Sequence, residues 1–408
     1  MITSRILPRT TRSLFTKSVR ALSANATTTA PEKTSLYDFH VANNGKMVDF
    51  AGYLLPVQYA NLSITASHLH TRKHASIFDV SHMLQTYIHG KDAINCFEQL
   101  CTADIHGLPE NVGTLTVFTN ATGGILDDLI VTKVRSDLLY VVSNAAMKVS
   151  DKALIQNAVD QYQKSKKDVS VEFLDPSDRA LIAVQGPEAM KAVQGLTKRP
   201  LDKFYFMQTM TADIAGVSDC RVTRCGYTGE DGCEISISAD RASHVVENLL
   251  GSKLGHVELA GLGARDSLRL EAGLCLYGSD IGETTKPVES GLAWLVAKRR
   301  REEGNFPGAT AVLDQLKNGC KQRRVGIKMA NGPPARHGAE IFKDGKVIGT
   351  VTSGCPSPSI GGNVAMGYVL DEFKGVGQKV DVNIRNKMYG AEIAKMPFIK
   401  TNYFTDKK

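Results

Sequence analysis

The sequence predicts an α+β protein whose mixed body is followed by a small antiparallel β-barrel. Short helix and strand patterns alternate to about residue 290, without the strict order of a doubly wound sheet. A charged, glycine-containing segment follows, and beyond it six short strand patterns recur at regular spacing. The 408 residues, of which 42% are hydrophobic, are enough for two or three domains.

Residues 1–31 differ in composition from the rest of the chain. They are rich in serine and threonine and contain no acidic residue. Their five cations are Arg5, Arg9, Arg12, Lys17 and Arg20. This composition is typical of a mitochondrial transit peptide, with a disordered basic tail as the alternative. Because the leader holds five charges of the formal net +7, the remainder gives little support for nucleic-acid binding.

The body is predicted to begin with an aromatic, loop-rich segment at residues 34–60. Helical patterns follow at residues 61–76, 91–101 and 148–165, with strand alternation at 77–90. Residues 113–144 are typical of a hairpin that turns at Gly123-Gly124 and continues into a third strand, Leu138–Ser143. No apolar run is long enough for a membrane span, so we expect no membrane insertion.

The composition of residues 298–324 suggests a linker. We predict the linker at residues 306–323, between a body at 32–305 and a barrel domain at 324–408. The predicted barrel strands are Arg324–Met329, Ala339–Phe342, Lys346–Ser353, Ala365–Leu370, Lys379–Ile384 and Ala391–Lys395.

The basic, histidine and cysteine residues outside the main motifs are compatible with a structural role or with a functional one. The basic run Lys298–Arg301 is either solvated surface or a docking patch for an acidic partner. His68, His70 and His74 have no carboxylate or cysteine at ligand spacing, so we expect a surface helix face and no metal. The eight cysteines contain no Cys-x-x-Cys pair and are expected to be free thiols.

The strand after Gly123-Gly124 carries two adjacent carboxylates, Asp127 and Asp128. An unpaired buried carboxylate is costly, so such residues are rare in strand interiors. Successive strand residues point to opposite faces, so only one of the two can face a given pocket. Either one of them serves chemistry, or both pair locally at the end of the hairpin.

Two further segments combine glycines with charged residues, although neither is a phosphate-binding loop. Three glycines between residues 226 and 232 predict a tight loop before Glu234, which either grips a flat heterocycle or faces solvent. Arg265 lies in the first turn of a predicted helix, where the dipole disfavours a cation. It therefore needs a ligand or an internal partner such as Glu230 or Asp231. Trp294 either stacks on the ring of a ligand or packs against the protein's own apolar side chains.

Taken together and in order, these motifs resemble the T-protein (aminomethyltransferase) family of the glycine cleavage system. The matching segments are Val48–Gly52, Phe78–Met83, Gly123–Ile130, Gly226–Glu234, Gly263–Gly273 and Thr352–Pro358. The resemblance extends from about residue 34 to the end of the chain. One departure is Tyr53, where the family pattern has tryptophan, and it affects only local packing.

The resemblance implies a folate-binding α+β body of two intertwined domains with a C-terminal antiparallel β-barrel. It implies transfer of a one-carbon unit from aminomethyl-lipoyl H-protein to tetrahydrofolate, giving 5,10-methylenetetrahydrofolate, ammonia and dihydrolipoyl H-protein. Tetrahydrofolate is then a co-substrate and H-protein supplies the lipoyl group, with no metal or flavin. The expected partners are H-protein and, functionally, the P- and L-proteins, in the mitochondrial matrix.

The resemblance also implies which residues form the site. Asp128 corresponds to the catalytic aspartate, which positions and polarises the folate nitrogens, and Glu234 to the residue that grips the pterin. Further folate-site residues are Asn144, Arg265 and Tyr403, with Met83, Tyr227 and Trp294 as weaker candidates. Asp127 is then expected to be structural.

Two related functions remain as alternatives. The chain could be a folate-dependent demethylase or the transferase half of a dimethylglycine or sarcosine dehydrogenase, but the glycine-rich flavin fingerprint of those dehydrogenases is missing. It could also be a non-enzymatic folate-binding protein of iron–sulfur assembly. Those relatives carry a reactive cysteine in a Lys-Gly-Cys-Tyr motif, whereas this chain has Arg224-Cys225-Gly226-Tyr227.

Overall fold

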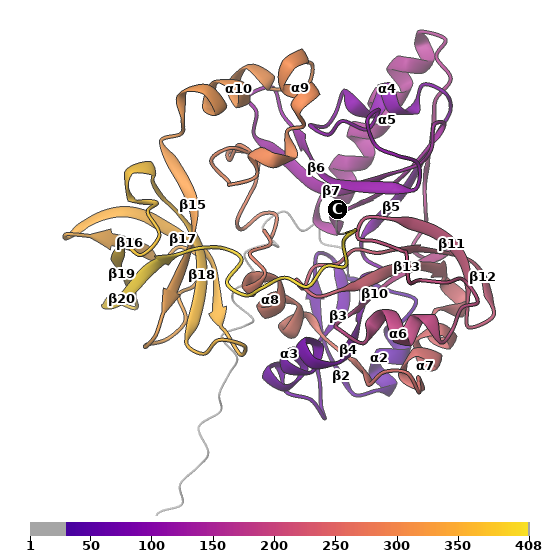
Figure 1. Ribbon diagram of the computed structural model, residues 1–408, viewed down its shortest axis with the longest axis horizontal. Helices are drawn as coiled ribbons and strands as arrows, with labels where there is room; N and C mark the ends of the chain where they lie inside the picture. The colour runs from indigo at the N-terminus through magenta and orange to yellow at the C-terminus, as the bar shows by residue number, and fades with distance from the viewer. Residues whose placement is uncertain (1–29, 407–408) are drawn as a thin grey trace, which may run out of the picture.

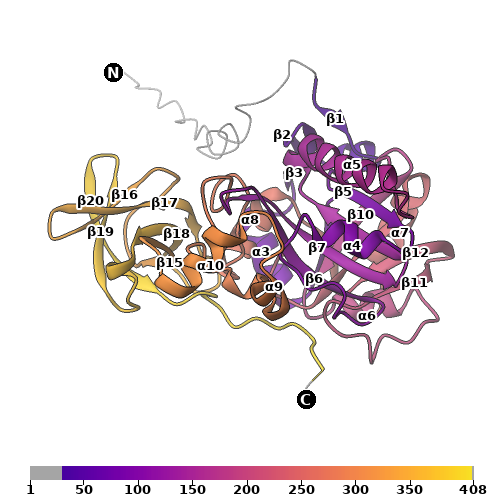
Figure 2. The same cartoon turned by 90° about the horizontal axis from the view of Figure 1, so that it is seen from above.

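The computed structural model describes residues 30–406. Figure 1 shows a larger body of sheets and helices with the C-terminal barrel beside it, and Figure 2 shows the same two parts from above. The transit peptide predicted at residues 1–31 lies outside the described residues, except for its last two. Within residues 30–406, no helix has the length and apolar character needed to cross a membrane.

One large sheet of the body has five strands in the order β6-β7-β8-β5-β9. These strands are β5 (Leu84–His89), β6 (Val112–Thr119), β7 (Ile125–Arg135), β8 (Leu138–Ser143) and β9 (Ser170–Phe173). Helices α4 (Ala93–Glu98) and α5 (Lys148–Lys164) share its apolar core. The predicted hairpin, its third strand and the helix at 148–165 are confirmed. The hairpin turn requires glycine, because a Cβ on Gly124 would lie 1.8 Å from the carbonyl oxygen of Glu283.

The other large sheet has six strands in the order β11-β12-β13-β10-β4-β14. They are β4 (Ala75–Asp79), β10 (Arg179–Gln185), β11 (Thr209–Ile214), β12 (Val217–Thr223), β13 (Gly232–Ser238) and β14 (Val257–Leu259). Helices α6 (Ala189–Gln194) and α7 (Ala242–Leu250) pack against it. Because β4 precedes the five-stranded sheet in sequence and the other strands follow it, the two sheets are interleaved in the chain, as the resemblance implies.

A smaller sheet, ordered β1-β3-β2, completes the body. Its strands are β1 (Glu32–Lys33), β2 (Gly45–Phe50) and β3 (Tyr53–Tyr59), and the nearby helices are α2 (Tyr37–Ala42), α3 (Ile64–Lys73) and α8 (Leu262–Glu271). Ser63 caps α3 because its hydroxyl accepts the Ala66 N–H at 3.1 Å. Helix α8 starts directly against β3. The position before it requires glycine, because a Cβ on Gly261 would lie 2.6 Å from the Val57 backbone. Short 3₁₀ turns are η1 (Ala145–Met147), η2 (Ala239–Arg241), η3 (Ala293–Leu295) and η4 (Asp371–Phe373).

The C-terminal domain is a closed six-stranded barrel in the order β15-β18-β17-β16-β19-β20, confirming the predicted barrel. Its strands are β15 (Gln322–Met329), β16 (Glu340–Lys343), β17 (Lys346–Pro356), β18 (Asn363–Leu370), β19 (Lys379–Ile384) and β20 (Lys387–Ala394). The pairs with assigned register are antiparallel. The inward faces form a separate apolar core, which includes Ile327, Val351 and Ile393.

The single strand predicted at residues 77–90 is wrong, because β4 and β5 belong to different sheets. The carboxylate of Asp79 accepts the Ser81 N–H at 2.9 Å, and the Met83 N–H bonds to the Val80 carbonyl oxygen at 3.0 Å. These bonds turn the chain out of one sheet and into the other. Local alternation cannot show such a transfer, because both strands have the same period of two.

The loop predicted at residues 34–60 is also wrong, since this segment contains α2, β2 and β3. Pro56 within β3 disfavours a strand assignment from sequence. In the structure the register slips between Lys46 and Met47, and this irregularity lies opposite Pro56. The strand therefore accommodates a residue that has no N–H to donate.

Residues 298–324, whose composition suggested a linker, contain two helices: α9 (Lys298–Glu303), at the end of the predicted body, and α10 (Ala309–Asn318), within the predicted linker at 306–323. Phe306 and Val312 pack with Val288 and Val296 in a small core. The sequence signal was hidden because Gly304 and Gly308, which suggest a loop, are the left-handed residues that end α9 and precede α10.

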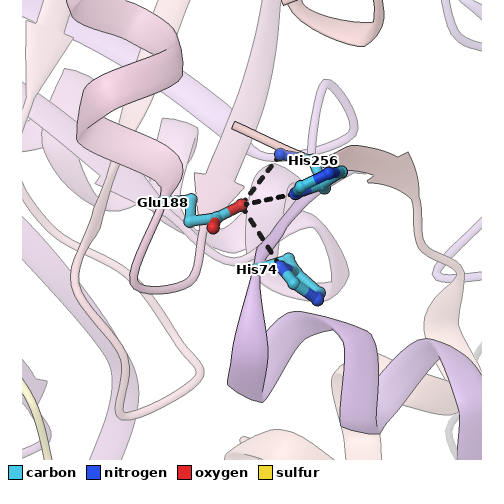
Figure 3. Close-up of side chains that lie close together, drawn as sticks. All are labelled: His74, Glu188 and His256. Carbon is cyan, nitrogen blue, oxygen red and sulfur yellow. Dashed lines mark hydrogen bonds and ion pairs between the residues drawn. The ribbon is translucent and has the colours of Figure 1, made fainter. Parts of the chain in front are cut away.

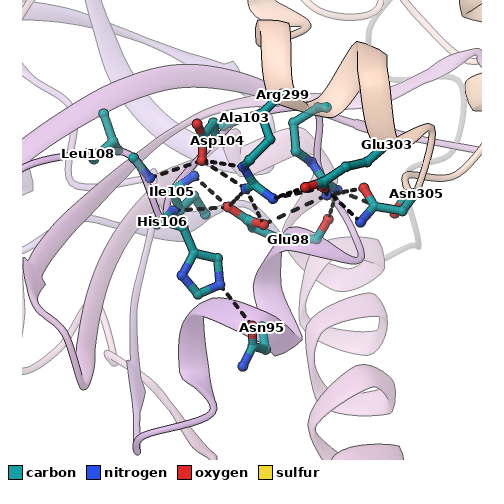
Figure 4. Close-up of polar contacts among 12 residues, drawn as sticks. Asn95, Glu98, Ala103, Asp104, Ile105, His106, Leu108, Arg299, Glu303 and Asn305 are labelled. Atoms are coloured by element: carbon teal, nitrogen blue, oxygen red, sulfur yellow. Dashed lines mark hydrogen bonds and ion pairs between the residues drawn. The ribbon is translucent and has the colours of Figure 1, made fainter.

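The basic run Lys298–Arg301 does not form a free docking patch (Figure 4). Arg299 pairs with Glu98 at 2.6 Å and with Asp104 at 2.8 Å, and Arg300 is 1% exposed. Arg301 is exposed but its guanidinium donates to the Val296 carbonyl oxygen at 2.7 Å, and the side chain of Lys298 is 92% exposed. A buried cation must be paired, so this run holds α9 against α4.

Candidate functional site

A cavity of about 650 Å³ lies among the two large sheets, helix α8 and the C-terminal tail. Its size is in the range of small-molecule sites. All eight side chains predicted from sequence line it: Met83, Asp128, Asn144, Tyr227, Glu234, Arg265, Trp294 and Tyr403. They come from segments far apart in the chain, so the structure brings together every member of the predicted set. Asp127 does not line the cavity.

Asp128 and Asp127 lie on opposite faces of β7, as strand geometry requires. Asp127 is completely buried, whereas Asp128 is partly accessible from the cavity. Both are bound by Asn144 at the end of β8. Its Nδ2 lies 2.9 Å from Oδ1 of Asp127 and 3.0 Å from Oδ1 of Asp128, and its backbone N–H donates to Oδ2 of Asp127 at 3.0 Å.

A third carboxyl, Asp151 of α5, lies behind this pair and is 1% exposed. Burial, followed by repulsion from Asp151 and Asp128, raises the pKa of Asp127 well above its usual range. Burial also raises the pKa of Asp151 to about 6, although a hydrogen bond from Asp127 opposes this shift. Burial and the neighbouring charges therefore favour the protonated form of Asp127, whereas Asp151, with a pKa of about 6, is mostly ionised at neutral pH.

Burial raises the pKa of Asp128 to about 6, against the lowering effect of its hydrogen bond from Asn144. The charge of Asp151 raises it further, and Arg265 lowers it. Asp128 is thus ionised at neutral pH but close to protonation. A carboxylate in this condition can accept a proton or stabilise a cation in the cavity.

Glu234 and Arg265 face the same cavity from β13 and α8. Burial raises the pKa of Glu234, and the charge of Arg265 opposes that rise. The Arg265 guanidinium lies 5.0 Å from the ring centroid of Tyr227, within the range of a cation–π contact. The internal partners expected for Arg265 are wrong, because Glu230 pairs with Arg72 and Asp231 with Arg224.

The C-terminal tail closes one side of the cavity. The ring of Tyr403 stacks on Phe206 with centroids 4.4 Å apart, and the Phe206 N–H donates to the Phe404 carbonyl oxygen at 2.8 Å. The Asn402 N–H donates to the carbonyl oxygen of Gly229 at 2.8 Å, which places the tail against the glycine-rich loop. Tyr403 is therefore held in place by contacts that no local motif reveals.

Sequence reasoning missed several cavity residues. His82 is buried, its Nδ1 has no hydrogen-bond partner within residues 30–406, and burial lowers its pKa to about 3. It therefore presents a neutral imidazole. Tyr277 donates to the carbonyl oxygen of Ile125 at 3.2 Å, and Arg324 reaches the cavity from the barrel. His82 adjoins Met83 in a motif already noted, whereas Tyr277 and Arg324 carry no local signal.

Two family models match this chain. The model of the GCVT N-terminal domain matches residues 36–300, and that of the glycine cleavage T-protein C-terminal barrel domain matches residues 322–400.

Relatives of known name span almost the whole chain. The human mitochondrial aminomethyltransferase is 52% identical over 373 residues, 91% of each chain, and that of Solanum tuberosum is 48% identical over 374 residues, also 91% of each. The crystal structure of the glycine cleavage system aminomethyltransferase T from Bartonella henselae is 37% identical and superposes with a TM-score of 0.85. That match covers 92% of this chain and 99% of the other.

Asp127→Asn is expected to lower stability more than turnover. An amide at this position turns one N–H group toward a donor of Asn144, and a lost buried hydrogen bond costs about 1–3 kcal/mol. Urea unfolding should show the loss, while kcat, measured on the folded variant, should change less. Unchanged stability combined with a large fall in kcat would assign Asp127 to the chemistry instead.

Asp151→Asn is expected to move the acid limb of the pH–rate profile to lower pH without lowering the plateau. The substitution removes the charge that raises the pKa of Asp128, and Asp151 does not line the cavity. Because the folded pKa of Asp151 is raised to about 6, wild-type stability falls as pH rises from about 4 through 6. The variant should lack this fall, which amounts to roughly 1–3 kcal/mol. An unmoved acid limb would exclude coupling to Asp128.

Proposed function

The chain belongs to the glycine cleavage T-protein family, and we infer that its cavity carries out the aminomethyltransferase reaction of the glycine cleavage system. The enzyme transfers the one-carbon unit from aminomethyl-lipoyl H-protein to tetrahydrofolate. The products are 5,10-methylenetetrahydrofolate, ammonia and dihydrolipoyl H-protein. The observation that supports this function best is the convergence of all eight predicted site residues on one cavity of ligand size.

Asp128 is the proposed catalytic residue. Cleavage of the bond to the departing ammonia leaves cationic character on the transferred carbon. An ionised carboxylate in a partly desolvated cavity stabilises such charge more strongly than water does. With a pKa of about 6, Asp128 is mostly ionised at neutral pH, and the Asn144 amide fixes its orientation. We therefore propose that it acts first by charge and by positioning the folate nitrogens.

Glu234 is the proposed anchor for the pterin ring of tetrahydrofolate. A carboxylate offers two acceptor oxygens, which match the adjacent ring N–H and amino donors of a pterin. Arg265 and Tyr227 provide a cation and a ring face on the adjacent wall. Met83, Trp294 and Tyr403 add apolar and aromatic surface to the cavity wall. Trp294 is 63% exposed. Its exposure suggests that this side of the cavity is open to the lipoyl arm.

The partners and location follow from the same family. We propose lipoylated H-protein as the direct partner, with the P- and L-proteins linked through the same cycle. The relatives are named mitochondrial, which supports a mitochondrial location, and we propose the matrix. No nucleic-acid partner is proposed.

The iron–sulfur assembly alternative requires a reactive thiol in the loop after β12. Cys225 is 3% exposed, and burial raises its pKa well above the usual range. A thiol that is buried and protonated is a poor nucleophile. The chemistry of this loop therefore favours the transferase.

Asp128→Asn should fold normally and lose most methylenetetrahydrofolate formation from aminomethylated H-protein. The amide keeps the shape of the side chain but removes its charge. Thermal unfolding serves as the folding control, and free methylated amines replace H-protein to test the demethylase alternative. Full activity of this variant would exclude the proposed role of Asp128.

Glu234→Ala should weaken tetrahydrofolate binding by about 1–3 kcal/mol, which corresponds to roughly 5- to 150-fold in Kd. The reason is that donors of the bound ring lose their acceptor. Calorimetric titration with tetrahydrofolate measures the change, with Glu172→Ala as a matched control on an exposed strand. A Kd equal to that of the wild type would contradict the pterin anchor.

A further inference from the structure

Two histidines and a glutamate form a cluster outside the cavity, beside the edge strand β14 (Figure 3). His74 ends helix α3, Glu188 precedes α6, and His256 precedes β14. Oε2 of Glu188 lies 3.3 Å from Nδ1 of His74 and 3.4 Å from Nδ1 of His256. All three donor atoms lie within 4.8 Å of one another. None of these residues lines the folate cavity.

The backbone holds the three side chains in this arrangement. The Glu188 N–H donates to the His74 carbonyl oxygen at 3.2 Å, and the Ala75 N–H donates to the His256 carbonyl oxygen at 3.0 Å. The His256 N–H donates to Oε2 of Glu188 at 2.8 Å. A group bound here would therefore meet a site whose parts are already assembled, which reduces the ordering cost of binding.

The two distances from a histidine nitrogen to Oε2 of Glu188, 3.3 and 3.4 Å, match the spacing of zinc ligands more closely than that of short charged hydrogen bonds. Zn–N and Zn–O bonds of about 2.0–2.1 Å place tetrahedral ligands about 3.3–3.4 Å apart. Hydrogen bonds between an imidazolium and a carboxylate are shorter, about 2.7–2.9 Å. Distance alone does not define a site, because the exposed pair His89 and Glu172 has the same 3.3 Å separation. The cluster differs from that pair because a third side chain with a metal-binding atom lies within reach.

We propose that His74, Glu188 and His256 bind a zinc ion, with solvent completing the coordination. Two imidazole nitrogens and one carboxylate oxygen are a donor set that suits zinc, whereas magnesium prefers oxygen ligands only. The side chains are 37%, 27% and 79% exposed, so an ion can reach them from solvent. Bound zinc joins the end of α3, the start of α6 and the edge of the six-stranded sheet. Its effect is on stability, separate from the transferase chemistry.

The expectation of no metal came from spacing along α3, which shows only histidines. Glu188 and His256 are supplied by distant segments that the fold brings to the end of that helix. His74 remains at the surface, 37% exposed, and the fold places Glu188 and His256 beside it. His68 departs from the predicted surface face, because it is completely buried and hydrogen-bonded to Glu271.

The test is a titration of the untagged, EDTA-treated full chain with zinc sulfate against a chromophoric chelator. The wild type should bind one equivalent of zinc. His256→Ala and Glu188→Gln should bind none, or bind it with an affinity lower by more than about tenfold. Zinc should also raise the Tm of the wild type but not of the variants, because only the wild type binds it in the folded state. Visible absorption of the cobalt-substituted protein reports the coordination number.

His89→Ala is the matched control, since it removes a histidine from a pair that lacks a third ligand. It should bind zinc as the wild type does. The His256 side chain is exposed, and its backbone bond to Glu188 survives the substitution, so His256→Ala should fold. Equal zinc affinity and stoichiometry in wild type and His256→Ala would overturn the proposal, as would the absence of binding by the wild type. If zinc bound to the cysteines instead, the wild type and His256→Ala would likewise bind it equally.

Discussion

The carboxylate of Glu271, at the end of α8, holds the body, the barrel and the α3 region together. It is completely buried and accepts hydrogen bonds from His68 at 3.0 Å and Arg72 at 3.0 Å. From the barrel it accepts the Ser357 hydroxyl at 2.5 Å and the Ser359 N–H at 3.1 Å. These donors outweigh burial and lower the pKa of Glu271 to about 2. Its stabilising charge is therefore present above the unfolded pKa and is lost only as pH falls toward 2.

The cavity depends on this contact, because α8 carries Arg265 into the site and Glu271 against the barrel. Arg269, between them on the same helix, pairs with Asp280 at 2.7 Å and donates to Ser353 of the barrel at 2.9 Å. Arg324 reaches the cavity from β15. The barrel is thus part of the site's architecture, even though most of the eight predicted residues belong to the body.

Sequence reasoning succeeded where the signal is local or belongs to a motif. Five of the barrel strands were placed within three residues at each end, since each is bounded by turn residues. It failed where a long-range contact decides the structure. Asp79 redirects the chain between sheets through its bonds to Ser81 and Thr34. Asp151 lies on an ordinary amphipathic helix and shows its importance only beside Asp127. His256 has no local partner in sequence at all.

The contrast between Glu271 and the group around Asp128 shows what a functional carboxylate requires. Both are desolvated, but Glu271 has many donors, whereas Asp128 shares one amide with its neighbours. The Asn144 Nδ2 carries two hydrogens and faces three acceptors: Oδ1 of Asp127, and both Oδ1 and the backbone oxygen of Asp128. Burial and the charge of Asp151 favour the protonated form of Asp127, and a neutral carboxyl competes less strongly for the Asn144 amide than a carboxylate does. The Asn144 amide then remains available to Asp128, so the buried pair controls the hydrogen bond that orients the proposed catalytic carboxylate.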